Sequence, residues 1–373
     1  MMTTDACGLY VHIPFCVRKC SYCDFCSFAL STVDFRDRYI DRLCEEIRSY
    51  KSRGISLDTV FFGGGTPSLL TPDEFCRIVD AIRESFRLLL GHEFTVEVNP
   101  KTVDREKLEC FIGCGVNRLS IGLQSIHENE LKKLGRIHNY QDFLNSYNLA
   151  RECGIENINV DLMYGIPEQT MDSFGRTLEV ISALKPEHIS LYGLILEEGT
   201  PLYENRETIS FPTEDGECDM YYLATERLRD PGYSHYEISN YALPGRECRH
   251  NLKYWRCNEF IGVGLSAYSC FDGMRFGNGR DVNEYLLSRG DKYDCESISE
   301  ESAAYEYIML GLRLAEGISL DDYKDRFGSD FLSGREAIVD RLVSSGYLSC
   351  KDGRLSLTES GFYVSNSIIN ELI

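Results

Sequence analysis

The sequence predicts an α/β protein in which six βα repeats build a parallel sheet, closed into a barrel or an incomplete barrel, followed by a C-terminal helical, winged-helix-like domain. From residue 8 to about 195, short runs of β-branched and aromatic residues alternate with longer segments of helical periodicity. The alternation then stops, and the last part of the chain combines helical segments with a hairpin pattern. Parallel strands joined by right-handed helical crossovers account for the first pattern.

Six strands are expected in the repeat region, each short, apolar and rich in β-branched or aromatic residues. They are predicted at residues 8–15, 59–65, 94–100, 118–125, 157–167 and 188–196. Amphipathic helices are predicted between them, for example at residues 33–50 and 71–89. The second of these helices begins with Thr71 as its N-cap and Pro72 in its first turn.

The chain beyond the sixth strand departs from this repeat. A loop, a helix and a strand are predicted at residues 197–216, 217–229 and 234–242. A later helix is expected to end at Gly317, and a hairpin is expected to turn at Asp352-Gly353. We therefore expect a barrel core, a barrel extension and a C-terminal domain, at residues 1–200, 201–300 and 301–373.

The composition limits the partners of the chain. Its 373 residues carry a formal charge of −20 with a pI near 4.8, which argues against a nucleic-acid backbone or an anionic membrane as main partner. Residues 301–373 hold seven Lys and Arg against twelve Asp and Glu, so a transcription regulator that binds DNA through a winged helix is disfavoured. No signal-peptide pattern opens the chain, and its longest nearly apolar stretch, residues 260–271, is too short to span a bilayer. We expect a cytoplasmic protein with reduced thiols.

Four of the sixteen cysteines crowd the segment "HIPFCVRKCSYCDFCSF" at residues 12–28. Cys16, Cys20 and Cys23 follow the first predicted strand with spacings that let three thiolates bind three irons of a four-iron cluster, which leaves the fourth iron open. On the residues alone, a zinc knuckle or a group of buried thiols remains an alternative. Zinc normally takes four ligands in two pairs, and no second CxxC or CxxH pair appears elsewhere in the chain.

The stretch "CVRKCSYC" resembles the CxxxCxxC motif of the radical S-adenosylmethionine (SAM) family. This resemblance implies a partial (β/α)6 barrel and a 4Fe-4S cluster held by Cys16, Cys20 and Cys23. It also implies that the amino and carboxylate groups of SAM chelate the open iron. In that family, electron transfer to the cluster cleaves SAM to a deoxyadenosyl radical.

Polar residues at the ends of the other predicted strands match the SAM site of the same family. The glycine run "FFGGGTPS" lets a ligand approach the backbone closely, carboxylates can accept hydrogen bonds from ribose hydroxyls, and an arginine can pair with a carboxylate. By resemblance, the residues around SAM are Tyr10, Gly64, Gly65, Thr66, Glu97, Gln124, Arg136 and Asp161. On spacing alone, each polar side chain could equally make a hydrogen bond that caps a helix or ends a strand.

More narrowly, the chain resembles the branch that contains oxygen-independent coproporphyrinogen III oxidases and heme chaperones of the HemW type. The oxidase pattern has a fourth cysteine two places after the third, where this chain has Phe25; Cys26 falls one residue later. The segment "HNLKYW" is similar to the HNxxYW motif of the chaperone-like members. That similarity implies heme at His250, Asn251, Tyr254 and Trp255, whereas composition alone favours a core histidine. Cys248 is a further candidate thiolate ligand on its chemistry alone.

The resemblance implies a protein that binds heme and delivers it to heme-dependent proteins such as respiratory enzymes. The alternative is an enzyme of porphyrin biosynthesis, an oxygen-independent coproporphyrinogen III oxidase or another radical SAM reaction on a tetrapyrrole, and no catalytic residue is assigned. Expected partners are heme or another tetrapyrrole, a heme-receiving protein, an electron donor and, transiently, a membrane protein, for a monomer or dimer. The remaining cysteines are interpreted as small apolar residues: Cys7, Cys44, Cys76, Cys110, Cys114, Cys153, Cys218, Cys257, Cys270, Cys295 and Cys350.

Overall fold

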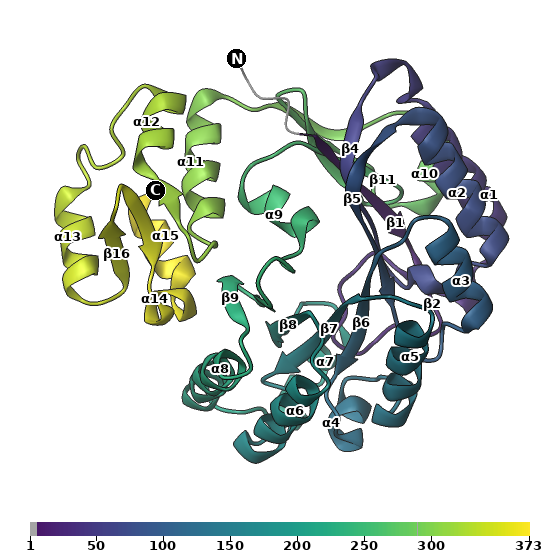
Figure 1. The fold of residues 1–373 in the computed structure, drawn as a ribbon, viewed down its shortest axis with the longest axis horizontal. Helices are drawn as coiled ribbons and strands as arrows, with labels where there is room; N and C mark the ends of the chain where they lie inside the picture. The colour runs from purple at the N-terminus through teal and green to yellow at the C-terminus, as the bar shows by residue number, and fades with distance from the viewer. Residues whose placement is uncertain (1–5, 289) are drawn as a thin grey trace.

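The computed structural model describes residues 6–288 and 290–373, and it contains one large curved sheet whose outer side is covered by helices (Figure 1). All six predicted strands are present, and each is parallel to its neighbours among the six. They are β1 (Cys7–Ile13), β4 (Ser56–Gly64), β5 (Arg87–Val98), β6 (Arg118–Gln124), β7 (Asn157–Tyr164) and β8 (His188–Gly193). Every residue of β6 is buried, as expected for a parallel strand that is covered on both faces.

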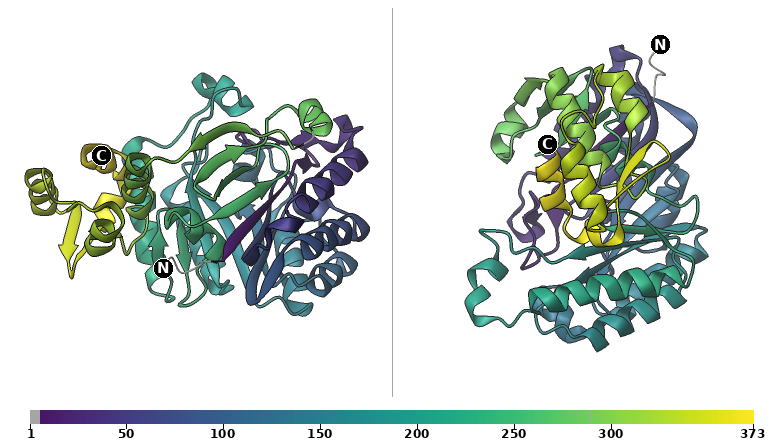
Figure 2. Two further views of the ribbon diagram at one scale, coloured as in Figure 1. Left: turned by 90° about the horizontal axis from the view of Figure 1, so that it is seen from above. Right: turned by 90° about the vertical axis from the view of Figure 1, so that its left-hand side faces the viewer.

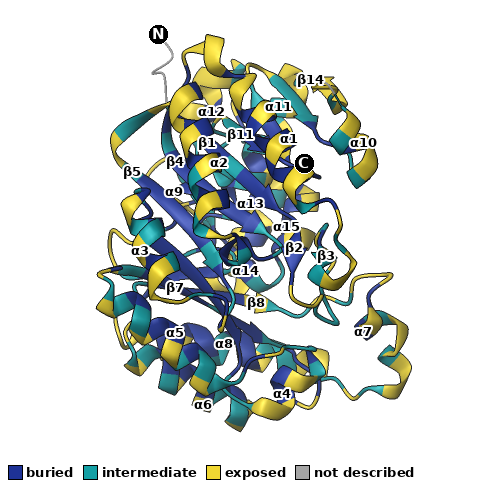
Figure 3. Cartoon of the chain, turned by 90° about the vertical axis from the view of Figure 1, so that its right-hand side faces the viewer, coloured by how far each residue is buried: buried dark blue, intermediate teal, exposed yellow. Residues whose placement is uncertain are grey.

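Helices link these strands and pack their apolar faces against the sheet, while their outer faces are exposed (Figure 3). The predicted start of the second helix at Thr71 is confirmed, because the side chains of Thr71 and Glu74 form a capping box. The helix ends at Ser85, and not at residue 89 as predicted, because the chain from Arg87 onward pairs with β4 as part of β5. The helices of this layer are α1 (Arg36–Arg48), α2 (Pro72–Ser85), α3 (Arg105–Gly113), α4 (Glu128–Lys133), α5 (Tyr140–Glu152) and α6 (Met171–Ala183).

The barrel extension adds strands at both ends of the sheet and leaves it open. β11 (Phe260–Val263) pairs in parallel with the free side of β1, a partnership that the sequence did not predict. Three antiparallel strands continue from there: β12 (Tyr268–Phe271), β13 (Met274–Gly277) and β14 (Tyr293–Ser297). At the opposite end, residues 234–242 form a hairpin of β9 (Ser234–Glu237) and β10 (Asn240–Ala242), and not the single strand that was expected. In the described sheet, β14 and β9 are the two terminal strands, so the barrel is incomplete.

Shorter elements complete this part of the chain. The predicted loop at 197–216 contains the short helix α7 (Pro201–Glu204), and the helix predicted at 217–229 is α8 (Glu214–Arg229). Two two-residue strands, β2 (Phe15–Cys16) and β3 (Phe28–Ala29), pair in parallel at either end of the cysteine-rich loop. The helices α9 (Arg249–Trp255) and α10 (Val282–Leu287) belong to the extension.

The C-terminal region lies at one end of the molecule and has a hydrophobic core of its own (Figure 2). The hairpin predicted at Asp352-Gly353 is confirmed, since both residues adopt positive φ between paired strands. The first helix ends at Gly311, six residues earlier than predicted, and Gly317 ends the turn that leads into the small sheet. The elements are α11 (Glu300–Gly311), β15 (Ile318–Ser319), α12 (Leu320–Phe327), α13 (Glu336–Ser344), β16 (Leu348–Lys351), β17 (Arg354–Leu357), α14 (Glu359–Tyr363) and α15 (Ser365–Leu372).

Two features join the C-terminal region to the barrel. The outer side of β9 makes backbone hydrogen bonds to the turn after α11, from the Ile238 amide to the Arg313 carbonyl and from the Ala315 amide to the Tyr236 carbonyl, both at 2.9 Å. Helix α9 lies between the sheet and α11 (Figure 1). Within the described residues, no helix combines the length and apolar character that a membrane span requires.

Candidate cofactor site

A cavity of about 410 Å³, here called the barrel cavity, opens at the carboxyl ends of the parallel strands. Its wall combines the cysteine-rich loop with residues from all six parallel strands and from helix α9. The predicted site residues that line it are Tyr10, Cys16, Cys20, Cys23, Gly64, Gly65, Glu97, Gln124, Arg136, Asp161, His250, Asn251 and Tyr254. Thr66 lies behind this wall, and Trp255 lies on the other side of α9.

The cysteine-rich loop is fixed to the barrel at both ends and at its centre. The β2–β3 pair closes its base, and Ser21 donates its amide to the carbonyl of Leu134 at 3.0 Å. Two donors point at the thiols: Arg136 Nη1 lies 3.5 Å from Cys20 Sγ, and Thr66 Oγ1 lies 3.7 Å from Cys16 Sγ. Hydrogen bonds from such donors stabilise a thiolate, which is the form that binds metal.

The arrangement of these thiols suits a cluster better than a single ion. Among the described residues, Cys16, Cys20 and Cys23 do not form a group whose sulfurs all lie within 4.8 Å of one another. In a four-iron cluster each thiolate binds a different iron, so the sulfurs stand further apart than the ligands of one zinc ion. Burial raises the pKa of Cys16, and it raises that of Cys23 to about 11, so the ligand state requires the positive charge of the metal.

Cys26 is separate from these three residues. It does not line the barrel cavity, and its Sγ faces the carbonyl oxygen of Arg280 at 3.7 Å. Its own carbonyl lies 2.8 Å from His12 Nε2. The geometry therefore separates Cys26 from the other three cysteines of residues 12–28, which line the barrel cavity.

The glycine run after β4 brings the backbone close to the cysteine-rich loop. Gly64 has a φ of +107°, and a Cβ atom there would lie 2.4 Å from the ring of His12. A Cβ atom on Gly65 would lie 2.7 Å from the carbonyl oxygen of Phe15. Behind them, Asn99 donates its amide to Thr66 Oγ1 at 2.7 Å, which holds this wall in place. Larger residues would push the loop away from the strand.

Two partly buried carboxyl groups face the cavity, and neither pairs with a lysine or arginine among the described residues. Burial, followed by the charge of Asp161, raises the pKa of Glu97 to about 8, although the Gly64 amide donates to its Oε2 at 3.1 Å. Burial also raises the pKa of Asp161, against the hydrogen bond that Asn159 donates at 2.7 Å. A cationic ligand would relieve both groups, and SAM carries a sulfonium. The pair thus fits the predicted cofactor.

Two further predicted residues have polar atoms that a ligand could satisfy. Gln124 ends β6 at a bulge with a φ of +73°, and its buried Oε1 has no hydrogen-bond partner within the described residues. Arg136 is held by the carbonyl of Gly122 and the side chain of Asn99, each at 2.6 Å. Its guanidinium is therefore positioned before any carboxylate arrives.

Sequence reasoning missed several residues of the cavity. Arg118 is only 2% exposed, and its Nε has no hydrogen-bond partner among the described groups. Arg118 was not predicted because it begins β6, whereas the predicted site residues lie at the C-terminal ends of the strands. The other polar residues that line the cavity without having been predicted are Arg18, Lys19, Tyr22, Asn99, Ser120, Asn159, Ser190 and Tyr192.

The predicted heme motif forms α9, and His250, Asn251 and Tyr254 of the motif line the barrel cavity. His250 is 1% exposed, and both of its ring nitrogens have partners, Thr59 Oγ1 at 2.9 Å and the Tyr254 hydroxyl at 2.8 Å. The ring also stacks on Phe61, with 5.3 Å between centroids. Burial lowers the pKa of His250 to about 3, so the imidazole is neutral. Iron could bind it only after one of these hydrogen bonds is broken.

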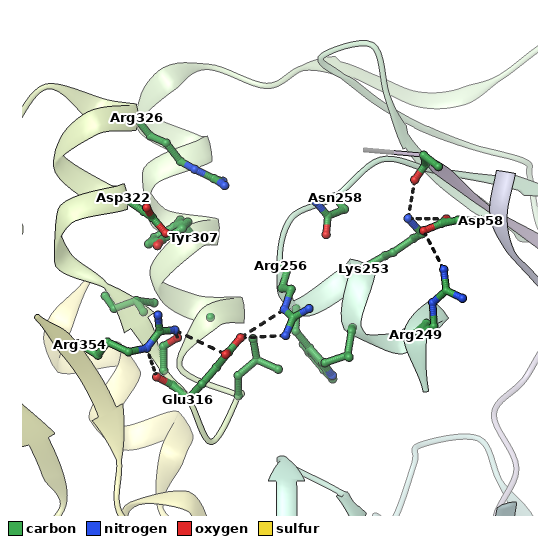
Figure 4. Close-up of a pocket in the computed structure, with 17 residues that line it drawn as sticks. Asp58, Arg249, Lys253, Arg256, Asn258, Tyr307, Glu316, Asp322, Arg326 and Arg354 are labelled. Carbon is green, nitrogen blue, oxygen red and sulfur yellow. Dashed lines mark hydrogen bonds and ion pairs between the residues drawn. The ribbon is translucent and has the colours of Figure 1, made fainter. Parts of the chain in front are cut away.

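Trp255 instead lines a second cavity of about 500 Å³, here called the junction pocket, between α9 and the C-terminal region (Figure 4). Charged side chains dominate it: Arg256 and Arg354 both reach Glu316, at 3.1 and 3.9 Å, and Lys253 pairs with Asp58 at 2.8 Å. The helical repeat explains why the motif faces two cavities. His250 and Tyr254 are four residues apart and share one face of α9, whereas Trp255 lies on another face.

Cys248 lines neither cavity. It is fully buried, and its Sγ lies 3.6 Å from Glu93 Oε1. Burial raises its pKa to about 12, so the thiolate form is strongly disfavoured. The structure gives no support to Cys248 as a ligand of heme in either cavity.

Comparison with known proteins adds two family matches and several full-length relatives. The model of the Radical SAM superfamily matches residues 10–181, and that of the HemN C-terminal domain matches residues 298–364. The heme chaperone HemW of Lactococcus lactis is 35% identical over 98% of this chain and 96% of its own. The heme chaperone HemW of Escherichia coli is 34% identical over 97% of both chains.

Among solved structures, the fold is similar to that of coproporphyrinogen III oxidase (HemN) from Escherichia coli, a radical SAM enzyme. The TM-score is 0.87 over 98% of this chain and 90% of that one, with 21% sequence identity. At this identity the likeness concerns the fold, including the incomplete barrel and the appended C-terminal region.

Proposed function

Because the chain belongs to the HemW-type family of radical SAM proteins, we propose that it is a heme chaperone that binds a 4Fe-4S cluster, SAM and heme, and delivers the heme to heme-dependent respiratory proteins. The observation that carries the proposal is the convergence of the three motif cysteines, the glycine run and two partly buried carboxyls on one cavity. The barrel, its extension and the C-terminal domain, proposed at 1–200, 201–300 and 301–373, each contribute a wall to one of the two cavities.

The proposed cluster ligands are Cys16, Cys20 and Cys23, with SAM on the open iron. The donors beside Cys16 and Cys20 and the mutual spacing of the thiols support this assignment. The sulfonium of SAM would face Glu97 and Asp161, and its carboxylate would pair with Arg136. The cluster, when bound, supplies an electron to SAM; the residues of this chain hold SAM and exclude water from it.

The proposed heme residues are His250, Asn251, Tyr254 and Trp255. Support comes from the position of α9, which lies between the two cavities. A heme bound through His250 requires that the imidazole exchange its hydrogen bond with Tyr254 for iron. SAM and the cluster, in the cavity that His250 also lines, would then regulate heme transfer and need not turn over. We further propose a cytoplasmic protein, monomeric or dimeric, with an electron donor and transient contact with a membrane protein during delivery.

The oxidase alternative is tested by one anaerobic experiment. Cluster-loaded protein is incubated with SAM, a reductant and coproporphyrinogen III, and in parallel it is titrated with hemin. We expect stable heme uptake, seen as a shifted Soret band, and no protoporphyrinogen at enzymatic rates. Decarboxylation of the porphyrinogen on the enzymatic timescale would reject the chaperone function. Phe25, at the place of the oxidase's fourth cysteine, favours the chaperone.

A further inference from the structure

A second group of three thiols lies on the outer helical layer, away from the barrel cavity. Cys76 lies on α2, Cys110 lies on α3, and Cys114 is the C-cap of α3. The Sγ of Cys76 is 3.6 Å from that of Cys110 and 3.6 Å from that of Cys114. Of the side chains that the structure describes, these make the only set of three His, Cys, Asp or Glu whose ligand atoms all lie within 4.8 Å of one another.

Helix packing builds this thiol triad from residues far apart in sequence. Cys110 and Cys114 are four residues apart, so they share one face of α3. That face packs against α2, where the rings of Phe75 and Phe111 lie 4.4 Å apart between centroids and fix the register of the two helices. Cys76, next to Phe75, is thereby held between the two thiols of α3. The sequence predicted these three cysteines as small apolar residues, and it gave no sign that helix packing brings their sulfurs within 4.8 Å of one another.

The spacing of the sulfurs matches the ligands of one metal ion. With metal–sulfur bonds of roughly 2.3 Å and tetrahedral angles, two thiolates on one ion stand roughly 3.8 Å apart. The two Sγ distances of 3.6 Å from Cys76 need little adjustment to reach that value. All three thiols are free, and they are partly or fully buried, which shields a bound ion from competing ligands.

We propose that Cys76, Cys110 and Cys114 form a second metal site that binds one thiophilic d10 ion, Zn²⁺ or Cu⁺, through three thiolates. Binding converts three thiols to three thiolates and releases three protons to solvent, with no change of oxidation state. A Zn²⁺ ion keeps a water in its fourth position, whereas Cu⁺ is satisfied by three soft ligands. The ion would join α2 to α3, two successive helices of the barrel's outer layer.

The surroundings of the triad are consistent with this chemistry. Burial and the neighbouring thiols raise the pKa of Cys110 to about 11 and that of Cys114 to about 12, so the empty site is protonated. A bound cation reverses this effect, because it stabilises each thiolate directly. Arg83, which donates to the Cys114 carbonyl at 3.0 Å, supplies a positive charge beside the anionic three-thiolate complex.

The test counts metal ions on cluster-loaded protein. Anaerobic protein is equilibrated with Zn²⁺ in one arm and with chelator-buffered Cu⁺ in the other, desalted, and analysed for iron, zinc and copper. We expect about one additional zinc or copper ion per chain, which the variants Cys76→Ser and Cys114→Ser lose. The matched control is Cys153→Ser, since Cys153 is the C-cap of α5 as Cys114 is of α3, and it should keep the ion. Iron content should be the same in all four proteins, so a failure of the cluster assignment is seen separately.

A second measurement needs no substitution. Metal-loaded wild-type protein is treated with an alkylating reagent, and the labelled cysteines are mapped by mass spectrometry. We expect Zn²⁺ or Cu⁺ to slow labelling of the three triad thiols at least roughly tenfold, without slowing that of Cys153. The proposal is overturned if wild type retains no zinc or copper beyond the level of the two triad variants, or if neither ion protects the triad thiols.

Discussion

The two cavities on either side of α9 differ in how they hold charge. In the barrel cavity, Arg118 is buried, and partial burial raises the pKa of Glu97 and that of Asp161. In the junction pocket, Glu316 and its two arginine partners are 41 to 49% exposed, so water and salt screen their ion pairs. Charge in the barrel cavity therefore controls what can bind there, whereas the Glu316 ion pairs of the junction pocket have little effect until a ligand or partner displaces the water.

The sharpest test of the barrel cavity is the loss of a cluster ligand. We expect Cys20→Ser to abolish stable cluster binding, because a cluster held by two thiolates exposes two irons. Iron and sulfide analysis after anaerobic reconstitution measures this. In the control Cys26→Ser, the iron content should match that of wild type. Loss of about a quarter or more of the iron in this control would contradict the three-ligand set.

The partly buried carboxyls should make SAM binding depend on pH. With a pKa of about 8, Glu97 is mostly protonated at pH 6 to 7 in the free protein, and a cationic ligand requires its ionised form. SAM affinity should therefore rise about tenfold per pH unit below pH 8 and level off above it. Calorimetric titrations at several pH values test this. Glu97→Gln should weaken binding at pH 8 and flatten the profile; a wild-type affinity independent of pH would remove Glu97 from the site.

The same raised pKa of Glu97 makes the free energy of unfolding change with pH in the opposite direction to SAM affinity. Between the ordinary value of 4.5 and about 8, the folded protein without ligand holds a proton on Glu97 that the unfolded chain has lost. The contribution of this group to the free energy of unfolding is thus greatest at low pH and decreases as the pH rises through that range. Denaturant titrations of wild type and Glu97→Gln should converge at low pH.

The heme affinity of variants on the two faces of α9 shows whether heme binds in the barrel cavity or in the junction pocket. If iron binds His250, the variant Tyr254→Phe should tighten heme binding about fivefold, since it removes a competing hydrogen bond of about 1 kcal/mol. His250→Ala should weaken it more than Trp255→Ala, which removes a stacking contact of about 1 kcal/mol. Hemin titrations followed in the Soret band give the ranking. The reverse ranking, with Tyr254→Phe neutral, would move the heme to the junction pocket.

The smallest effect is expected at the ion pairs of the junction pocket. Glu316→Gln removes the carboxylate shared by Arg256 and Arg354, and exposed pairs of this kind contribute about 1 kcal/mol or less to the free energy of unfolding. Urea unfolding at low and high salt should show a difference that shrinks as salt is added. A loss well above this size would mean that the junction pocket holds the C-terminal region in place through charge.

The six parallel strands could be predicted because each is a local apolar run, and the site residues at their ends follow from the topology. The pairing of β11 with β1 could not be predicted from the sequence, since about 250 residues separate these two short segments and no local pattern selects a partner strand. Helical periodicity could have separated Trp255 from His250. Only part of the thiol triad could be predicted from the sequence. The helical spacing of Cys110 and Cys114 places them on one face of α3, but the position of Cys76 depends on how α2 and α3 pack.

The hydrogen bonds between β9 and the turn at residues 313–315 have a consequence for solubility. An incomplete barrel has two terminal strands whose outward amides and carbonyls can recruit strands of other molecules. The backbone contacts at Tyr236 and Ile238, with a single bridge between Glu237 and Leu314, occupy those groups on β9. The C-terminal region thus protects the edge of β9 from edge-to-edge aggregation. In a chain truncated before α11, the outer edge of β9 would be free to pair with a strand of another molecule.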